Sequence, residues 1–413
     1  MSHSSPLTNQ TSTIVYNMNA ISQFSTELSA LVHCLRQFNR GDDAYVLQDL
    51  LKKDMDWNSF FRLLRRHRVT VQTHKVLQQL PRGHVDSQIL SRLKCQSALV
   101  VQRNMGMTAY LISLTRQLTD TGIAYLAFKG PVAGYDLYGT PGIRQMRDLD
   151  ILIDPEALTQ AEAVLLKNGF TRIVPDFSLP PRQLSYFIKN GHHFVYAHPV
   201  KKCVIELHWR LFGNSVLFPI SFSMLWQQKR SIRMGTQDIF TLGREHTFLM
   251  LSVHGSKHSW NRLFWLNDIA RMMHAGAITD WPGFTSQVKK MGIERMVAES
   301  VILAHCILGT PLPEPVACLA AEDPVIPKMV ERSLFLISFP EEGIRPFNRA
   351  YRYLKWHQTF LVRNINYHLW HAGVNAGPTL TNMKMISLPD PLFPLYYVIR
   401  PLIWFNRYFI RRR

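Results

Sequence analysis

The segment GIRQMRDLDILID, residues 142–154, constrains the fold more than any other, because it places carboxylates within a strongly apolar run. The run predicts a buried strand, whose side chains alternate between two faces. Asp148, Asp150 and Asp154 then share one face with Leu152, while Leu149, Ile151 and Ile153 share the other. Adjacent carboxylates repel each other, and burying them is costly unless a cation lies between them. The segment therefore predicts a strand with one cation-binding face.

A third acid falls in another predicted strand. Residues 192–209, HHFVYAHPVKKCVIELHW, contain two alternating runs around a Pro-Val-Lys-Lys connection, which predicts a hairpin. In its second strand the apolar side chains face the core and leave Glu206 and His208 on the opposite face. A glutamate in an apolar strand is costly without a partner, so Glu206 is a candidate third ligand. His208 is interpreted as a packed or hydrogen-bonded residue, and a catalytic role for it stays open.

A turn upstream of these strands has the character of a phosphate site. IAYLAFKG, residues 123–130, predicts a short strand ending in Lys129 and Gly130, and a short helix follows from Pro131. The free N–H groups of such a turn attract phosphate, and a lysine adds a point charge. Carboxylates about one strand repeat apart suit Mg²⁺, which also binds substrate phosphates. Together these features predict two-metal phosphoryl or nucleotidyl transfer.

The remaining periodicity is mostly helical, and the predicted fold class is α+β. Helical spacing covers about 24–82, about 86–120 and 155–170, and it returns after about 243. Asp56 is the predicted N-cap of one of these helices. We expect a small mixed sheet with flanking helices, between helical N- and C-terminal regions. The predicted division is a helical region 1–104, a core 105–245, a helical region 246–388 and a basic aromatic tail 389–413.

The bulk composition excludes several classes of protein. Five scattered cysteines without a CxxC pair argue against a disulfide framework or a thiolate zinc site. The first residues lack a basic stretch followed by an apolar one, so we expect no secretory signal and a cytoplasmic protein. The net charge is +18, and residues 343–413 hold eleven basic residues against one acid. Much of the excess charge therefore lies near the C-terminus, where it attracts nucleic acid or anionic lipid.

The tail segment PLFPLYYVIRPLIWFNRYFIRRR, residues 391–413, is both aromatic and basic. Arg400 and Pro401 interrupt its apolar run, so the run is too short to span a bilayer. Aromatic residues with flanking arginines suit peripheral contact with the inner face of a membrane. A terminal helix packed on the core also fits, and both interpretations stay open.

The order of four motifs carries a resemblance to a known family. FKG, GIRQMRDLDILID, IELHW and HGSKHSWNRLFWLNDIA follow one another between about Asp56 and about Arg271. In this order they resemble the uncharacterised bacterial nucleotidyltransferase family of the polymerase-beta-like superfamily. The resemblance implies a polymerase-beta-like core, a nucleoside triphosphate as substrate, and Mg²⁺ or Mn²⁺ as cofactor. It also implies a sugar, a peptide or another small molecule as acceptor, in preference to nucleic acid.

The resemblance also implies roles for individual residues. Asp148 and Asp150 would hold the metal ions, with Glu206 as the third carboxylate, and Lys129 and Gly130 would lie at the nucleotide phosphates. The family turn usually has a Gly-Ser or Gly-Gly pair closer to the paired acids. In this chain the proline after the turn glycine has no N–H to donate.

Four residues around the predicted strands have alternative interpretations. Asp154 precedes a proline and fits the start of the following helix better than a metal site. Arg144 and Arg147 fit phosphate binding, because guanidinium groups suit that role. Either arginine fits equally as a buried partner of Glu206.

The motif HGSKH and the helix after it leave further alternatives. His254 and His258 are four residues apart on a predicted helix, but the motif lacks the glutamate of HExxH zinc enzymes. We interpret the histidines as structural, or Lys257 and His258 as part of a nucleotide pocket. Asp268 is a candidate partner for Lys257.

The sequence therefore favours a metal-dependent nucleotidyltransferase that moves a nucleoside monophosphate to an acceptor hydroxyl. Two other classes stay open. One is a catalytically inactive relative that binds a nucleotide. The other is a peripheral membrane or nucleic-acid binding protein that acts through its basic C-terminal tail.

Overall fold

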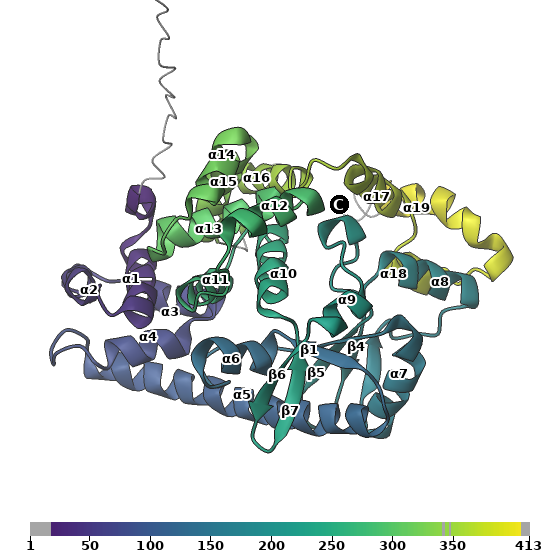
Figure 1. Ribbon diagram of the computed structural model, residues 1–413, viewed down its shortest axis with the longest axis horizontal. Coiled ribbons are helices and arrows are strands. Elements are labelled where there is room, and N and C mark those ends of the chain that lie inside the picture. Colours follow the sequence, from purple (N-terminus) through teal and green to yellow (C-terminus); the bar gives the residue numbers. More distant parts are fainter. Residues whose placement is uncertain (1–17, 341–342, 347, 406–413) are drawn as a thin grey trace, which may run out of the picture.

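The computed structural model describes residues 18–340, 343–346 and 348–405. Figure 1 shows a small sheet between the long helix α5 (Ser87–Asp120) on one side and the helices α10 (Arg244–Lys257) and α11 (Leu263–His274) on the other. The α+β class predicted from the sequence is confirmed by this mixture of one mixed sheet and many helices.

The N-terminal region is helical, as predicted. The side chain of Asp56 accepts a hydrogen bond from the Ser59 N–H, which confirms the predicted N-cap. Helix α5 passes through residue 104, so that predicted boundary falls inside a helix, and the division into domains stays a prediction. The other elements of this region are η1 (Met18–Gln23), α1 (Thr26–Arg40), α2 (Ala44–Leu51), α3 (Trp57–His67) and α4 (Thr70–Leu77).

The main sheet has five strands in the order β1-β2-β5-β4-β3. β2 and β5 are parallel, and the other neighbouring pairs are antiparallel. The predicted hairpin of residues 192–209 is confirmed as β4 and β5. The strands are β1 (Tyr125–Phe128), β2 (Leu149–Ile153), β3 (Thr171–Val174), β4 (His193–Ala197) and β5 (Val204–His208).

Between the strands lie short helices and a second, smaller sheet. Asp154 caps η2 through its side chain, which accepts from the Glu156 N–H, so its interpretation as a helix-start residue is confirmed. The sequence analysis missed the antiparallel hairpin of β6 (Arg230–Met234) and β7 (Gln237–Thr241), which contacts β1. The helices are α6 (Gly130–Tyr138), η2 (Pro155–Ala157), α7 (Leu158–Lys167), α8 (Pro181–Asn190), η3 (Ser215–Leu217) and α9 (Phe222–Gln227).

The two faces of β2 contact different parts of the molecule. Leu149, Ile151 and Ile153 belong to an apolar cluster with residues of α5 and α7. Leu152 belongs to the larger cluster that includes the helices of both terminal regions. Because side chains alternate along a strand, Asp150 lies on the Leu152 face, toward α10 and α11. The predicted alternation is therefore confirmed, and it directs the carboxylate away from the α5 face.

The C-terminal region extends as helices well beyond the motifs. Helices continue to residue 405. Together with α10 and α11, the elements are α12 (Trp281–Met291), α13 (Glu294–Leu308), α14 (Glu314–Glu322), α15 (Val325–Ser338), α16 (Arg349–Thr359), α17 (Ile365–Ala376), α18 (Leu380–Met385), η5 (Asp390–Leu395) and α19 (Tyr396–Phe405).

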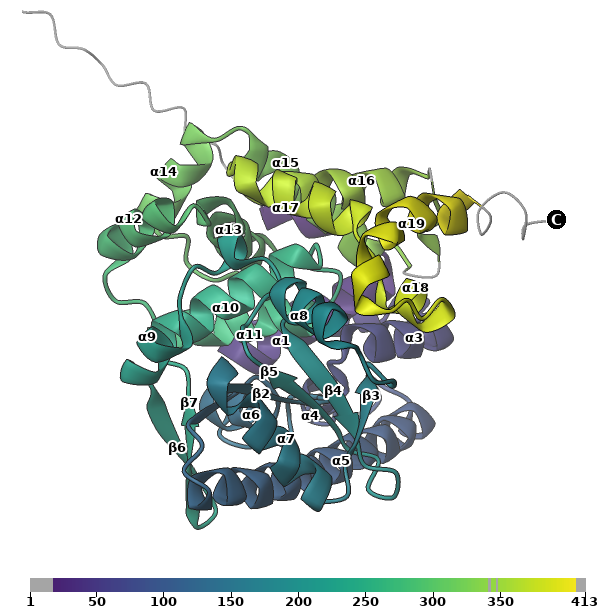
Figure 2. The same cartoon turned by 90° about the vertical axis from the view of Figure 1, so that its right-hand side faces the viewer.

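The last described segment folds back onto the rest of the chain. Figure 2 shows α18 and α19 close to α8, and Phe393 and Tyr396 are buried in a cluster that includes Leu179. This packing matches the interpretation of the tail as a docked segment for residues 390–396. Among the described residues, no helix is long and apolar enough to cross a membrane. Residues 406–413 lie outside the described part, and membrane contact stays a prediction.

Candidate active site

The register of the sheet brings two of the predicted carboxylates together. In the parallel pair of β2 and β5, Asp150 is the direct partner of Glu206. Directly paired residues have side chains on the same face of a sheet, so the two carboxylates project toward the same space. Asp150 is 4% exposed. Such a pair is repulsive unless cations or donors lie beside it.

Asp148 completes the acidic group from the residue just before β2. It lines the same cavity as Asp150 and Glu206. Burial, together with the negative charges of these two acids, raises the pKa of Asp148 to about 6. The structure therefore brings the three predicted metal ligands to one cavity. Among them, Asp148 has the raised pKa.

Two cationic groups contact the acids. Nζ of Lys129 lies 3.2 Å from Oδ1 of Asp150. Nε2 of His208 lies 3.3 Å from the same oxygen and 3.2 Å from Oε2 of Glu206. Burial disfavours the charge on Asp150, but Lys129 and His208 more than offset this and hold its pKa below the usual range. Asp150 is therefore ionised, and an anionic centre is maintained at neutral pH.

His208 also affects the other acid. Burial raises the pKa of Glu206, but the adjacent His208 ring more than offsets this effect, so the pKa of Glu206 lies below its usual value. Burial opposes a charge on His208, and Asp150 and Glu206 outweigh it and raise the pKa of the ring. Of the two sequence interpretations of Glu206, the ion pair with an arginine is wrong, because the contact that the structure shows is with His208.

The Lys129–Gly130 turn lies at the wall of the cavity, and its predicted role in phosphate binding stays a prediction. Lys129 has a φ of 56° and Gly130 a φ of 42°, and helix α6 begins at Gly130. A Cβ on Gly130 would make only an ordinary van der Waals contact, at 3.5 Å, with the backbone oxygen of Asp148. The positive φ therefore explains why a glycine occupies the position.

The cavity has a volume of about 250 Å³ and is lined by charges of both signs. The acids occupy one part of its wall. The pKa of Arg68 is lowered to about 9 by its burial and by the neighbouring charge of Arg262 and Arg147. Clustered guanidinium groups beside carboxylates suit a ligand that carries phosphates and a divalent cation together. The cationic residues of the wall are Arg68, Lys129, Arg144, Arg147 and Arg262.

Arg144 lines the cavity, and its side chain is held in place by Asp268. Its Nε donates to Oδ2 of Asp268 at 2.8 Å, and Tyr138 donates to Oδ1 of the same carboxylate at 2.9 Å. The predicted pairing of Asp268 with Lys257 is therefore wrong. Asp268 is fully buried. An arginine suits a buried carboxylate as its partner, because the guanidinium is planar and stays charged. Asp268 thus holds Arg144 in place at the cavity wall.

The HGSKH motif contributes histidines to the cavity wall. His254 and His258 both line it, and the His258 ring stacks on Trp265 with 5.3 Å between the ring centroids. Burial, with the charge of Lys257, lowers the pKa of His258 to about 3, so the ring is neutral. Nζ of Lys257 lies 5.9 Å from the centroid of the Phe212 ring. Lys257 is not among the lining residues, and its nucleotide-binding role stays a prediction.

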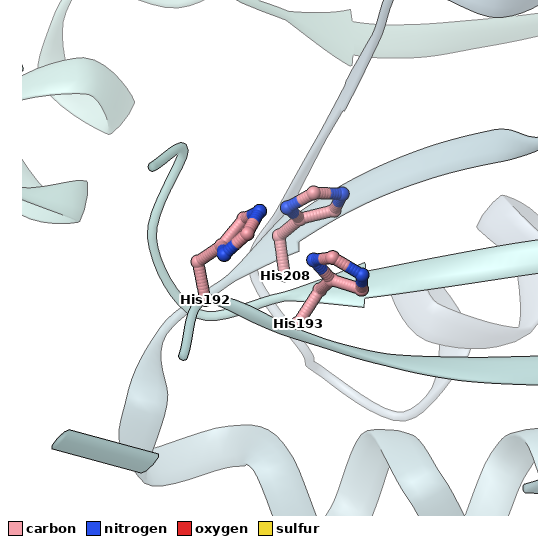
Figure 3. A group of neighbouring side chains, drawn as sticks. All are labelled: His192, His193 and His208. Atoms are coloured by element: carbon pink, nitrogen blue, oxygen red, sulfur yellow. The ribbon is translucent and has the colours of Figure 1, made fainter. Parts of the chain in front are cut away.

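Two histidines next to the carboxylates were missed by the sequence analysis. Figure 3 shows His192 and His193 beside His208, with the three rings on the same side of their chain segments. His193 is the direct partner of His208 in the antiparallel register. The predicted hairpin around Pro-Val-Lys-Lys implies this pairing, so its register was the signal that could have found His193.

The donor set of the acidic group fits a divalent cation. Ligand atoms of Asp150, Glu206 and His208 lie within 4.8 Å of one another. Carboxylate oxygens are the ligands that Mg²⁺ and Mn²⁺ prefer, and Asp148 adds another at the same wall. Burial is the main cause of the raised pKa of Asp148, and the neighbouring Asp150 and Glu206 charges add to it. These residues could therefore hold a hard cation.

A second cavity adjoins the first. It has a volume of about 740 Å³ and shares Arg147 and Arg262 with the wall of the first cavity. The sequence places Arg62, Arg65 and Arg66 on one face of α3, and such a face is expected to be solvated. For Arg66 this expectation is wrong, because its Nη2 donates to the Leu336 oxygen at 2.7 Å. The face instead forms part of this cavity, whose arginines are Arg62, Arg65, Arg66, Arg147 and Arg262.

Comparison with known proteins identifies the family of this chain. The sequence model of a family described as "Uncharacterised nucleotidyltransferase" matches residues 53–309. A crystal structure of an antigenic nucleotidyltransferase-like protein from Paracoccidioides brasiliensis is 14% identical and covers 49% of this chain and 97% of its own, with a TM-score of 0.28. No match is found among curated proteins. Since the family match covers more than half of the sequence, the chain belongs to the uncharacterised nucleotidyltransferase family.

Proposed function

We propose that this protein is a metal-dependent nucleotidyltransferase that moves a nucleoside monophosphate from a nucleoside triphosphate to an acceptor hydroxyl. The observation that carries the proposal is the parallel register that pairs Asp150 with Glu206, with Asp148 on the wall of the same cavity. Family membership supports the same class of reaction. The order of the motifs favours a place in the polymerase-beta-like superfamily.

In the proposed reaction, Asp148, Asp150 and Glu206 hold Mg²⁺ or Mn²⁺. When bound, the ions would neutralise phosphate charge and activate the attacking hydroxyl. Lys129 lines the cavity beside Asp150, where its ammonium offers a point charge to a phosphate. Arg144, held by Asp268, keeps its guanidinium at the wall without the loss of side-chain entropy that a free arginine would incur on binding.

The Gly130–Pro131 turn offers fewer backbone N–H donors to the phosphates than a turn in which both residues have an N–H. Gly130 lines the cavity at the start of α6, but Pro131 has no N–H. The arginines of the wall supply compensating charge. We therefore propose that guanidinium groups, chiefly Arg68 and Arg144, replace part of the backbone phosphate contact in this protein.

We place the acceptor in the second cavity. Its arginines favour an acceptor that carries negative charge. Its volume, about 740 Å³, is typical of sites for small molecules, which favours such an acceptor over nucleic acid. The shared Arg147 and Arg262 lie where the two cavities meet.

The test is a screen of candidate acceptors with α-labelled nucleoside triphosphates and Mg²⁺ or Mn²⁺, followed by mass spectrometry of the labelled product. Asp150→Asn should reduce label transfer at least about 1,000-fold, because it removes a carboxylate from the metal site. Glu331→Gln, on the exposed face of α15, is the matched control and should transfer label normally. Unchanged transfer by Asp150→Asn would sink the proposal. Nucleotide binding without transfer in the wild-type chain would favour the inactive relative.

A further inference from the structure

A cluster of three imidazoles lies beside the carboxylate group. His192, His193 and His208 each offer one ring nitrogen, and these three nitrogens lie within 4.8 Å of one another. Figure 3 shows the three rings facing a common space. None of the three lines the nucleotide cavity. The cluster adjoins that cavity through His208, which contacts Asp150 and Glu206 on the cavity wall.

The backbone fixes the cluster from two adjacent strands. His193 and His208 are direct partners in the register of β4 and β5. His192 immediately precedes β4, and its carbonyl oxygen accepts a hydrogen bond from the Trp209 N–H at 3.0 Å. The ends of both strands are thereby held together where the histidines project. A site built on paired strands is more precise than a site on a free loop.

Buried nitrogens in the cluster have no hydrogen-bond partner. Nδ1 of His193 and both ring nitrogens of His208 are buried and without a hydrogen-bond partner among the described residues, although Nε2 of His208 lies within ion-pair distance of two carboxylates. His208 is 2% exposed, so water does not readily reach its ring. A buried polar atom without a partner is costly in free energy, and such atoms in a folded protein call for an explanation.

The two nitrogens of His208 have different surroundings. Nε2 lies next to the Asp150 and Glu206 carboxylates, at 3.3 and 3.2 Å. Carboxylates in this position orient an imidazole and increase the basicity of its other nitrogen, as they do for histidines that bind metal ions. Nδ1 of His208 is therefore the nitrogen suited to act as a ligand, together with the nitrogens of His192 and His193.

We propose that His192, His193 and His208 form a nitrogen-ligated site for Zn²⁺ next to the carboxylate site for Mg²⁺ or Mn²⁺, with His208 between the two. Imidazole nitrogens select Zn²⁺ over the hard ions that carboxylates bind. Three protein ligands leave one position of a tetrahedral ion for water or another group. The inference does not require the proposed nucleotidyl transfer, because it rests on the three histidines and the carboxylates beside them and not on any reaction.

The test uses Co²⁺ and Zn²⁺ with the purified full chain after treatment with a chelator. Co²⁺ should bind at one ion per chain and give the intense visible absorption of a tetrahedral site with nitrogen ligands, and Zn²⁺ should displace it. His192→Ala should weaken Zn²⁺ binding at least about 100-fold, since it removes one of three ligands. His193→Gln should do the same, and circular dichroism of each variant checks the fold.

Two controls separate this site from other sites on the chain. His84→Ala removes a histidine from the turn before α5 and should bind Zn²⁺ as the wild-type chain does. Asp148→Asn changes the carboxylate site and should leave the Co²⁺ spectrum unchanged, whether or not the chain transfers nucleotides. Absence of stoichiometric Co²⁺ and Zn²⁺ binding in the wild-type chain would overturn the inference. Binding by a folded His192→Ala that equals wild type would do so too.

Discussion

Two buried carboxylates in this chain, Glu299 and Asp150, have opposite kinds of surroundings. Glu299 on α13 is fully buried and accepts hydrogen bonds from Ser256, Ser333 and His357. These donors come from α10, α15 and α16, so the carboxylate joins four helices through contacts that stay within the protein. Every contact that the structure shows for Glu299 is attractive, which is the condition under which a buried charge stabilises a fold.

Asp150 has attractive contacts with Lys129 and His208, but it also lies beside two other acids. The group opens onto a cavity instead of being enclosed by donors. Burial raises the pKa of Asp148, and repulsion by Asp150 and Glu206 raises it further. The difference teaches that burial alone does not identify a functional carboxylate. A functional carboxylate is identified better by other acids beside it at a cavity, because a bound cation would stabilise such a group.

The largest effect on stability is expected at the enclosed carboxylate. Glu299→Ala should destabilise the chain by about 3–5 kcal/mol, because three donors lose their acceptor and a cavity remains. Urea or thermal unfolding measures the change. Glu331→Ala removes an exposed glutamate from the neighbouring α15 and serves as control. If the two variants have the same free energy of unfolding, the hydrogen bonds of Glu299 do not stabilise the packing of these four helices.

The open carboxylate group should respond in the opposite direction. Without metal ions, Asp148→Asn should stabilise the chain at pH 7 by about 1–3 kcal/mol, because the variant removes a charge that burial and two acids disfavour. The pKa of Asp148 is about 6 in the folded chain, above its ordinary value of 3.8. Between these values the folded state binds more protons than the unfolded state, so this residue's contribution to stability falls as pH rises.

The advantage of Asp148→Asn over wild type should therefore be small near pH 4 and reach its full size above pH 6. Thermal unfolding of both chains in a chelating buffer across this range measures it. The prediction is contradicted if Asp148→Asn is less stable than wild type at pH 7. It is also contradicted if the difference in stability between the two chains is the same at pH 4 and above pH 6.

The smallest effect is expected at an exposed ion pair. Nζ of Lys289 lies 2.7 Å from Oε2 of Glu322, and both side chains are about half exposed. Lys289→Ala should change the stability by less than about 0.5 kcal/mol, since water and salt screen such pairs. The same unfolding measurements check it. A loss of stability as large as that of Glu299→Ala would mean that the exposure of a charged side chain does not determine its contribution to stability in this protein.

Much of the fold could be predicted because its signals are local. The cap at Asp56, the long helix to Asp120 and the hairpin of residues 192–209 follow from short stretches of sequence. The β6–β7 hairpin was missed, although its runs flank Gly235 in a tight turn. Its strands mix charged and apolar residues, so the alternation is weak.

The site was predictable where residues lie on one strand and unpredictable where distant helices meet. Asp148 and Asp150 are two positions apart, so strand geometry alone places them together. Arg144 and Asp268 are separated by 124 positions, and only the packing of α11 against α6 and the sheet determines that they pair. The arginines of the second cavity also depend on helix packing, since α3 reaches the site through its tertiary contacts.

The most direct test of the central claim is to count the Mn²⁺ ions that the carboxylates bind. Electron paramagnetic resonance of the wild-type chain, with a non-hydrolysable ATP analogue, should show two bound ions per chain, as two-metal transfer requires. Asp150→Asn should lose at least one of them, whereas Glu331→Gln should keep both. Equal Mn²⁺ binding by wild type and Asp150→Asn would contradict the account, because the acids at the cavity would then have no part in holding the metal.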